Sequence, residues 1–209
     1  MRYERKYRIE NIEYQQVYQK IMSIAGAFRK SYGDRWVNSI YLDDLDFNAL
    51  NDNLSGISNR FKYRLRWYGD SLEELKKPIL EKKIKENMLG YKELFQMDSF
   101  INTPRGLRES LSIRQLQEKS AVPVVLIKYL RTYLQSFDNR VRITIDRSLN
   151  YFGINNYSID PFPIQDEAII LEVKYDEEIE EDISDILQAI PFRMTKNSKY
   201  CSGMLEYWE

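Results

Sequence analysis

The sequence predicts an α+β fold: a closed antiparallel β-barrel with a charged lumen, helices packed outside it, and a helix at the C-terminus. Two observations lead to this prediction. Segments in which apolar and charged residues alternate strictly recur along the chain, and period-two alternation is typical of β-strands. Consecutive strand-like segments are joined by short turns, which favours antiparallel pairing.

Composition limits the function before any motif is considered. The chain has 209 residues, of which 43% are hydrophobic and 30% charged, so we expect one domain spanning residues 1–209. The net charge of −1 gives no general basic field for nucleic acid. The absence of His excludes Ser-His-Asp and Cys-His catalysis and every His-based zinc site. A single cysteine, no signal peptide and no membrane-length apolar run predict a cytoplasmic protein without a membrane segment.

The alternating segments are the predicted strands, and residues 60–68 are the clearest of them. One face of that segment carries Arg64 and Arg66, and the other carries Leu65 and Trp67. The remaining strands are predicted at residues 2–9, 36–42, 78–85, 91–95, 128–135, 141–149 and 168–175. Helices are predicted at residues 11–25, 46–54, 98–122 with a break, 179–187 and 198–208.

The charged faces of these strands are the candidate site. Their reverse faces are strongly apolar and need covering by helices, so the charged faces must point inward. Like charges at strand spacing repel one another, and anions in the lumen would relieve that repulsion. Arginine suits phosphate because its planar fork donates two parallel hydrogen bonds, and interspersed carboxylates suit Mg²⁺ or Mn²⁺. The lumen residues expected are Arg64, Arg66, Lys83, Arg131 and Arg142, with Glu4, Glu81 and Glu172 among them.

A series of motifs, in order along nearly the whole chain, resembles a known family. The motifs are Tyr-Glu-Arg-Lys-Tyr at 3–7, Ser-Ile-Tyr-Leu-Asp at 39–43, Tyr-Arg-Leu-Arg-Trp-Tyr-Gly at 63–69, Leu-Glu-Lys-Lys at 80–83, Arg-Val-Arg-Ile-Thr-Ile-Asp at 140–146, Leu-Glu-Val-Lys at 171–174 and Lys-Asn-Ser-Lys-Tyr at 196–200. The chain resembles the polyphosphate polymerase domain of the vacuolar transporter chaperone (VTC) family, within the triphosphate tunnel metalloenzyme superfamily.

The resemblance implies roles for individual residues. Phosphate binding is implied for Lys6, Arg64, Arg66, Lys83, Lys92, Arg131, Arg142, Lys196 and Lys199. Arg64, Arg66 and Glu172 would be the catalytic residues, and Glu172 and Glu4 the ligands of a divalent metal, Mn²⁺ or Mg²⁺. Hydrolases of the superfamily often open with Glu-x-Glu-x-Lys. Here Arg2 replaces the first acid, which favours the polymerase branch.

We therefore expect a metal-dependent phosphotransferase that extends polyphosphate with the γ-phosphoryl group of ATP. Its ligands would be ATP, polyphosphate, triphosphate or pyrophosphate, and not nucleic acid; the sequence leaves the oligomeric state open. Two alternatives remain. An inorganic or nucleoside triphosphatase could use the same residues with water as the acceptor, and a non-catalytic module could bind polyphosphate without turnover.

Overall fold

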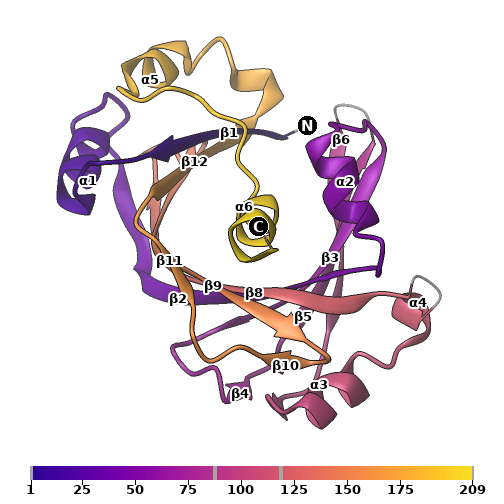
Figure 1. Cartoon of the computed structure of the whole chain (residues 1–209). Helices are drawn as coiled ribbons and strands as arrows, with labels where there is room; N and C mark the ends of the chain where they lie inside the picture. Colours follow the sequence, from indigo (N-terminus) through magenta and orange to yellow (C-terminus); the bar gives the residue numbers. More distant parts are fainter. Residues whose placement is uncertain (1, 87–88, 118–119, 209) are drawn as a thin grey trace. The chain divides into compact units, whose positions relative to one another are not determined.

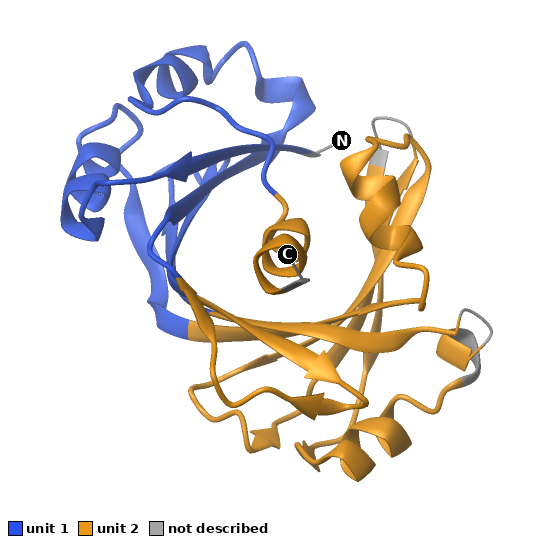
Figure 2. Ribbon diagram, viewed as in Figure 1, with its two compact units in different colours: residues 1–35, 129–149, 166–197 blue, residues 36–128, 150–165, 198–209 orange. Residues whose placement is uncertain are grey.

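The structure is a computed structural model that describes residues 2–86, 89–117 and 120–208. The chain forms two compact units (Figure 2). Unit 1 comprises residues 1–35, 129–149 and 166–197, and unit 2 comprises residues 36–128, 150–165 and 198–209. The long strands β2, β8 and β9 each contribute one part to unit 1 and one part to unit 2.

Both units are built on antiparallel β-sheet (Figure 1). In unit 1 the strand order is β1-β12-β9-β8-β2, and in unit 2 it is β9-β8-β2-β3-β5-β6. The bounds are β1 Arg2–Ile9, β2 Arg29–Asp43, β3 Arg60–Tyr68, β5 Ile79–Glu86, β6 Leu89–Gln96, β8 Val122–Gln135, β9 Arg142–Asn155 and β12 Ile169–Asp176. Short strands β10 (Ser158–Ile159) and β11 (Ile164–Asp166) pair with β9, and β4 (Glu74–Leu75) pairs with β7 (Phe100–Ile101).

The helices are short. Unit 1 contains α1 (Tyr14–Met22), the 3-10 turn η1 (Glu177–Ile179) and α5 (Ser184–Ala189). Unit 2 contains α2 (Asn48–Leu54), α3 (Pro104–Ser110), α4 (Arg114–Gln117) and α6 (Lys199–Trp208). Within the described part of the chain, none of these helices has the length and apolar character that crossing a membrane requires.

Each unit has its own apolar core on one face of its sheet. In unit 1, Leu171 and Ile143 of neighbouring strands pack with Val17 and Ile21 of α1. In unit 2, Leu65 and Leu80 pack with Leu107 of α3 and Leu116 of α4. The strand residues Leu65, Leu80, Ile143 and Leu171 occupy apolar positions of the alternating segments, so alternation located the buried face correctly.

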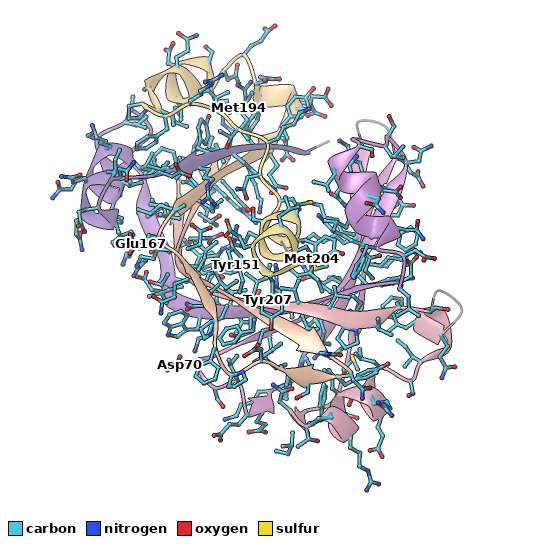
Figure 3. All side chains as sticks on the ribbon, in the orientation of Figure 1. Asp70, Tyr151, Glu167, Met194, Met204 and Tyr207 are labelled. Atoms are coloured by element: carbon cyan, nitrogen blue, oxygen red, sulfur yellow. The ribbon has the colours of Figure 1, made fainter. Side chains whose placement is uncertain are left out.

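Helix α6 packs on a sheet face of unit 2. Its Tyr200 ring stacks on Tyr41 of β2, with ring centroids 5.2 Å apart and planes 21° apart. A Cβ at Gly203 would lie 2.9 Å from the ring of Tyr151. Tyr151 and Tyr207 are labelled in Figure 3. A Cβ at Gly153 of β9 would lie 1.9 Å from the Tyr207 ring, so α6 lies almost on the β9 backbone. Glycine at 153 is required by this close approach.

The antiparallel α+β class is confirmed, whereas several boundaries differ from prediction. The closed barrel, its charged lumen and the single domain stay predictions. Strand β2 begins seven residues early, at Arg29 rather than 36, and β9 continues to Asn155 rather than 149. Of the helix predicted over 98–122, residues 104–110 and 114–117 are helical, 100–101 form β7, and 118–119 lie outside the described residues. The helix predicted at 179–187 is η1 followed by α5.

The early start of β8, at Val122 rather than 128, has a physical reason. Residues 122–127 read Val-Pro-Val-Val-Leu-Ile, an unbroken apolar run in which proline argues against a strand. In the structure this segment is buried on both faces: Leu126 lies in the core of unit 2, and Val125 and Ile127 lie close to Gly203 of α6. A strand covered on both faces has no polar side, so it shows no alternation.

Candidate functional site

In unit 2 the charged face is defined by β3. Lys62, Arg64 and Arg66 alternate with Tyr63, Leu65 and Trp67, and the latter three belong to the core. Antiparallel pairing with β5 and β6 then places further charged residues beside them. We call this surface the basic face; its residues are Lys62, Arg64, Arg66, Glu81, Lys83 and Lys92.

A row of three lysines crosses the basic face. Lys83 of β5 is directly opposite Lys62 of β3 on one side and Lys92 of β6 on the other. Directly opposed residues have Cβ atoms roughly 5 Å apart, and like charges in such pairs are destabilising. The Lys62 ammonium has neutral partners, the side-chain oxygens of Asn53 at 3.3 Å and Ser198 at 3.2 Å. A polyanion lying along this row would relieve the repulsion.

The arginines next to this row share one carboxylate. Arg64 Nε donates to Glu81 Oε2 at 2.7 Å, Arg66 Nη1 is 3.4 Å from Glu81 Oε1, and Lys92 Nζ is 3.7 Å from Oε2. Burial raises the pKa of Glu81, but Arg64, Arg66 and Lys92 outweigh it and lower that pKa, so the carboxylate is ionised. Among the six defining residues of the basic face, five are cations and one is a carboxylate, so these six residues carry a net positive charge.

Two buried polar atoms at this place have no hydrogen-bond partner within the part of the chain that the structure describes. They are Arg66 Nε and Ser39 Oγ. Ser39 of β2 is the cross-strand neighbour of Arg66, so the two atoms belong to adjacent positions. Leaving a buried donor unsatisfied is costly, and such groups in native proteins usually contact a ligand or solvent. An oxyanion could accept hydrogen bonds from both.

The charged face of unit 1 has a different balance. Arg131 of β8 is buried and donates from Nε and Nη2 to the two carboxylate oxygens of Asp146 at 2.5 and 2.6 Å. Its Nη2 is also 3.6 Å from Glu172 Oε2. Burial lowers the pKa of Arg131, but Asp146 outweighs it and raises that pKa well above the ordinary value. Arg131 is therefore an ion-pair partner in this structure.

Glu172 and Glu4 lie close to the same ammonium group. Lys174 Nζ donates to Glu172 at 3.0 Å and is 4.0 Å from Glu4. Lys6 Nζ is 3.3 Å from Glu4 and donates to the backbone oxygen of Asn197 at 3.0 Å. We call this surface of unit 1 the mixed face; its residues are Glu4, Lys6, Arg131, Asp146, Glu172 and Lys174.

The residues of the mixed face fit a metal only in part. Among the described residues, no group of three or more Asp, Glu or Cys side chains is gathered as a metal site. Glu172 and Glu4 nevertheless fit part of one, because both approach Lys174 Nζ and both supply the hard oxygen ligands that Mg²⁺ and Mn²⁺ prefer. Thr144, directly opposite Glu172 in the register, has a buried hydroxyl oxygen without a hydrogen-bond partner. Mg²⁺ usually takes one or two protein carboxylates and completes its shell with phosphate oxygens and water, so the chemistry of these two carboxylates matches the protein's share of such a site.

The remaining predicted residues lie in different settings. Arg142 of β9 is exposed and directly opposite Lys174, on the same side as the mixed face. Lys199 is buried at the start of α6 in unit 2. Lys196 is exposed and precedes that helix.

Sequence reasoning missed four residues of these faces. Lys62 lies on the basic face, and Asp146 and Lys174 lie on the mixed face, but none was assigned a role in binding or catalysis. Their places in the alternation were the available signal. Tyr41 was also missed: it lies directly opposite Arg64, on the side of the basic face.

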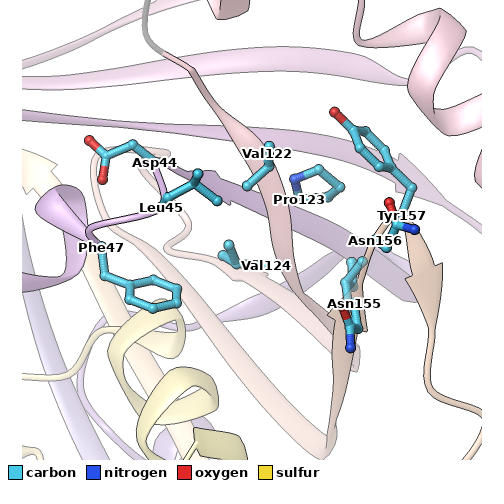
Figure 4. A pocket seen from close by; sticks show the side chains of 10 residues that line it. Asp44, Leu45, Phe47, Val122, Pro123, Val124, Asn155, Asn156 and Tyr157 are labelled. Carbon is cyan, nitrogen blue, oxygen red and sulfur yellow. The ribbon is translucent and has the colours of Figure 1, made fainter.

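A cavity of unit 2 differs in its chemistry from the basic face. About 330 Å³ in volume, it lies beside the segment before α2 and the first residues of β8, and Leu45, Val122, Pro123 and Val124 are among its lining residues (Figure 4). Among the described residues that line it, Asp44 is the one charged residue, and its charge is negative. Such a surface does not suit a polyanion, so the basic face remains the candidate phosphate site.

A model of the VTC domain family matches residues 1–207. The chain belongs to the VTC domain family. The match covers nearly its whole length and confirms the family indicated by the motifs. No curated protein matches the chain.

The fold of this VTC domain is similar to those of solved structures. A candidate adenylate cyclase from Vibrio parahaemolyticus aligns with a TM-score of 0.55 at 13% identity, covering 95% of each chain. A candidate adenylyl cyclase from Hippeastrum, described as having a dominant triphosphatase activity, aligns with a TM-score of 0.53 at 12% identity, covering 99% of this chain and 96% of the other. A protein from Pyrococcus horikoshii aligns equally well, with a TM-score of 0.53 at 13% identity over 98% of this chain and 96% of the other. At these identities the likeness concerns the fold.

Proposed function

We propose that this VTC domain is a metal-dependent phosphotransferase that moves the γ-phosphoryl group of ATP onto a growing polyphosphate chain. The observation that carries the proposal is the basic face of unit 2. There, three opposed lysines lie next to the half-buried Arg64 and the buried Arg66, and among the described residues Arg66 Nε and Ser39 Oγ lack hydrogen-bond partners. Membership in the VTC domain family supports a phosphate chain as the ligand.

The chemistry suits a chain without histidine. Phosphoryl transfer depends on positioning and on neutralising charge, and needs no protein nucleophile. Arg64 and Arg66 would bind the transferred phosphoryl group and stabilise the charge on its equatorial oxygens. Lys83 and Lys92 would bind neighbouring phosphates of the chain. The acceptor is the terminal phosphate of polyphosphate, whose oxygen forms the new bond to γ-phosphorus while the bond to the ADP leaving group breaks.

The mixed face of unit 1 would supply the metal. Glu172 and Glu4 would hold Mn²⁺ or Mg²⁺, which when bound neutralises phosphate oxygens and favours departure of ADP. Lys174 would be displaced from the two carboxylates. Lys6, Arg142, Lys196 and Lys199 would bind further phosphates. Arg131 has five N–H donors, of which Asp146 accepts two, so it would bind phosphate without leaving its ion pair.

Hydrolysis is the second candidate, because the similar Hippeastrum protein is described as having a dominant triphosphatase activity. Water would replace the terminal phosphate as acceptor, and the same residues would neutralise charge. The two reactions differ in product: a lengthening phosphate chain in one case, free phosphate in the other.

The test is product analysis with γ-labelled ATP. Purified protein is incubated with labelled ATP and Mn²⁺ or Mg²⁺, and the labelled product is sized on a gel. We expect a ladder of long chains. Labelled free phosphate without chains would show a hydrolase, and binding of polyphosphate without consumption of ATP would show a non-catalytic module.

Replacement of Glu172 tests the metal assignment. Glu172→Gln keeps the shape of the side chain but removes the charge that holds a divalent cation, so turnover should fall by at least about a hundredfold while the melting temperature stays near that of the wild type. Glu167→Gln is the matched control, since Glu167 is an exposed carboxylate of unit 1 outside the mixed face (Figure 3). Full activity of Glu172→Gln at saturating Mn²⁺ would exclude this carboxylate as the metal ligand.

A further inference from the structure

Tyr41 is a buried phenol among cations. It lies on β2 directly opposite Arg64, and Ser39, two residues earlier on the same face, lies opposite Arg66. Its ring stacks on Tyr200 of α6 and only 6% of the residue is exposed. Its hydroxyl therefore lies on the side of the basic face, where it accepts a hydrogen bond from Arg64.

The charges around the phenol change its acidity. Burial raises the pKa of Tyr41, but Arg64, Lys62 and Arg66 together outweigh burial and lower the pKa to about 8. Tyr200, stacked on it, behaves oppositely: burial and its hydrogen bond to the Asp43 carboxylate raise the pKa of Tyr200. Tyr41 is thus the more acidic phenol of the pair, because the neighbouring cations favour its ionised form.

Strands β3 and β5 and helix α6 contribute charged or titratable groups near Tyr41. Strand β3 contributes Lys62, Arg64 and Arg66, and β5 contributes Glu81, which is bonded to Arg64. Helix α6 contributes Tyr200, with Asp43 bonded to its hydroxyl. Asp43 also accepts hydrogen bonds from the backbone N–H groups of Asp44, Ala49 and Leu50. These bonds hold its carboxylate at the start of α2.

We propose that Tyr41 is a ligand of the phosphate chain, donating a hydrogen bond to a phosphate oxygen held by Arg66 and Ser39, and that phosphate and the Tyr41 phenolate are alternative anions at this position. The inference rests on the proposed function, because it assigns a further contact within the same site. Without ligand, the Tyr41 phenolate would balance part of the positive charge of the basic face, and a bound phosphate would take over that role.

The proton balance follows from this exchange. Without ligand, the phenol loses its proton to solvent as the pH rises through about 8 and becomes a phenolate beside the cations. A bound phosphate adds negative charge, which disfavours the phenolate and raises its pKa. Binding above pH 8 therefore returns one proton from buffer to the phenolate oxygen, and the affinity for phosphate falls as the pH rises through that value.

The first measurement is an ultraviolet titration of tyrosinate in the wild-type protein, with and without inorganic triphosphate. Of the 16 tyrosines, we expect one to ionise near pH 8 in the free protein and to shift to higher pH when triphosphate saturates the site. Tyr41→Phe should remove this early step. Tyr91→Phe is the matched control, because Tyr91 is an exposed phenol of β6 whose hydrogen bond to Glu86 raises its pKa.

The second measurement is calorimetric binding of triphosphate at pH 8.5 in buffers of different ionisation enthalpy. Wild type should take up more protons than Tyr41→Phe, by roughly three-quarters of a proton per site, the fraction of a group of pKa 8 that is ionised there. Equal uptake by the two proteins, or an early ionisation that triphosphate leaves unmoved, would overturn the role of Tyr41. If neither protein binds triphosphate at any pH while the early ionisation persists, the phosphate site itself, and with it the proposed function, is wrong.

Discussion

Arg66 and Arg131 are both buried arginines on charged strand faces, yet their partners differ. Arg131 gives two hydrogen bonds to Asp146, a carboxylate with no exposure to solvent. Arg66 lies 3.4 Å from a carboxylate oxygen of Glu81, a side chain that Arg64 and Lys92 also approach, and its Nε has no partner. At the residue scale, Arg131 is therefore held by the fold, whereas Arg66 is available to a ligand.

Arg66→Ala should separate function from stability. Glu81 keeps Arg64 and Lys92 as partners after the substitution, and like-charge repulsion on the basic face falls. The free energy of unfolding should stay near the wild-type value or rise slightly, while ATP turnover falls by about a hundredfold or more, the scale of losing a preorganised charge stabiliser. Arg66→Lys should fall between the two, since lysine keeps the charge but loses the fork. Melting curves and initial rates measure both effects.

The neighbouring position provides the control for that experiment. Leu65 projects from the opposite face of β3 and is fully buried in the core of unit 2. Leu65→Ala should cost about 2–5 kcal/mol of stability and leave turnover per folded molecule largely intact. If Arg66→Ala is destabilised to a similar extent, the arginine is a structural ion-pair residue instead.

Asp146→Ala should lower the free energy of unfolding, whereas Arg66→Ala should not. It removes the bidentate partner of a buried guanidinium, and breaking a buried ion pair typically costs about 3–5 kcal/mol. Urea unfolding measures the loss. The double variant Arg131→Met with Asp146→Leu should recover much of it, because it leaves no charge of this pair buried and unpaired. A stable Asp146→Ala would show that Glu172 alone can satisfy Arg131.

At the scale of elements, α6 is placed by glycines. The ring of Tyr207 occupies the space where a Cβ at Gly153 would lie, and its hydroxyl donates to the Asp160 carboxylate. The same helix carries Tyr200, which stacks on Tyr41. Docking of α6 on β9 therefore positions a wall of the candidate phosphate site.

Gly153→Ala should loosen this docking. The methyl group would overlap a ring fixed by its hydrogen bond, so we expect a loss of about 1–3 kcal/mol in stability, as for other overpacked positions. Gly33→Ala in β2 is the matched control, since a methyl group at that position would have nothing within 4 Å and the φ of Gly33 is not in the left-handed region. Thermal unfolding compares the two. Equal melting temperatures would mean that α6 adjusts without cost.

Alternation predicted those strands that have one polar and one apolar face, such as β1, β3, β5 and β12, and with them most of the candidate residues. It could not predict the first half of β8 or the end of β9, because α6 covers one face and the core the other. Nor could alternation reveal that Asp146 forms an ion pair with Arg131, because an ion pair between strands depends on their register. The lysine row likewise became visible through the pairing of β3, β5 and β6.

On the scale of the whole molecule, the net charge of −1 conceals an uneven distribution. The basic face of unit 2 has five cations and one carboxylate among its defining residues, whereas the mixed face of unit 1 has three of each. A protein with this arrangement should respond to polyvalent anions rather than to ionic strength. The central claim is that the basic face binds a phosphate chain.

The most direct test of that claim is the melting temperature of the wild type and of Arg66→Ala, with inorganic triphosphate and with chloride at equal ionic strength. A ligand at a hundredfold excess over its dissociation constant stabilises the native state by about 2.7 kcal/mol. We predict that triphosphate raises the melting temperature of the wild type well above the chloride value, and that of Arg66→Ala much less. Equal effects of triphosphate and chloride on the wild type would contradict the phosphate site.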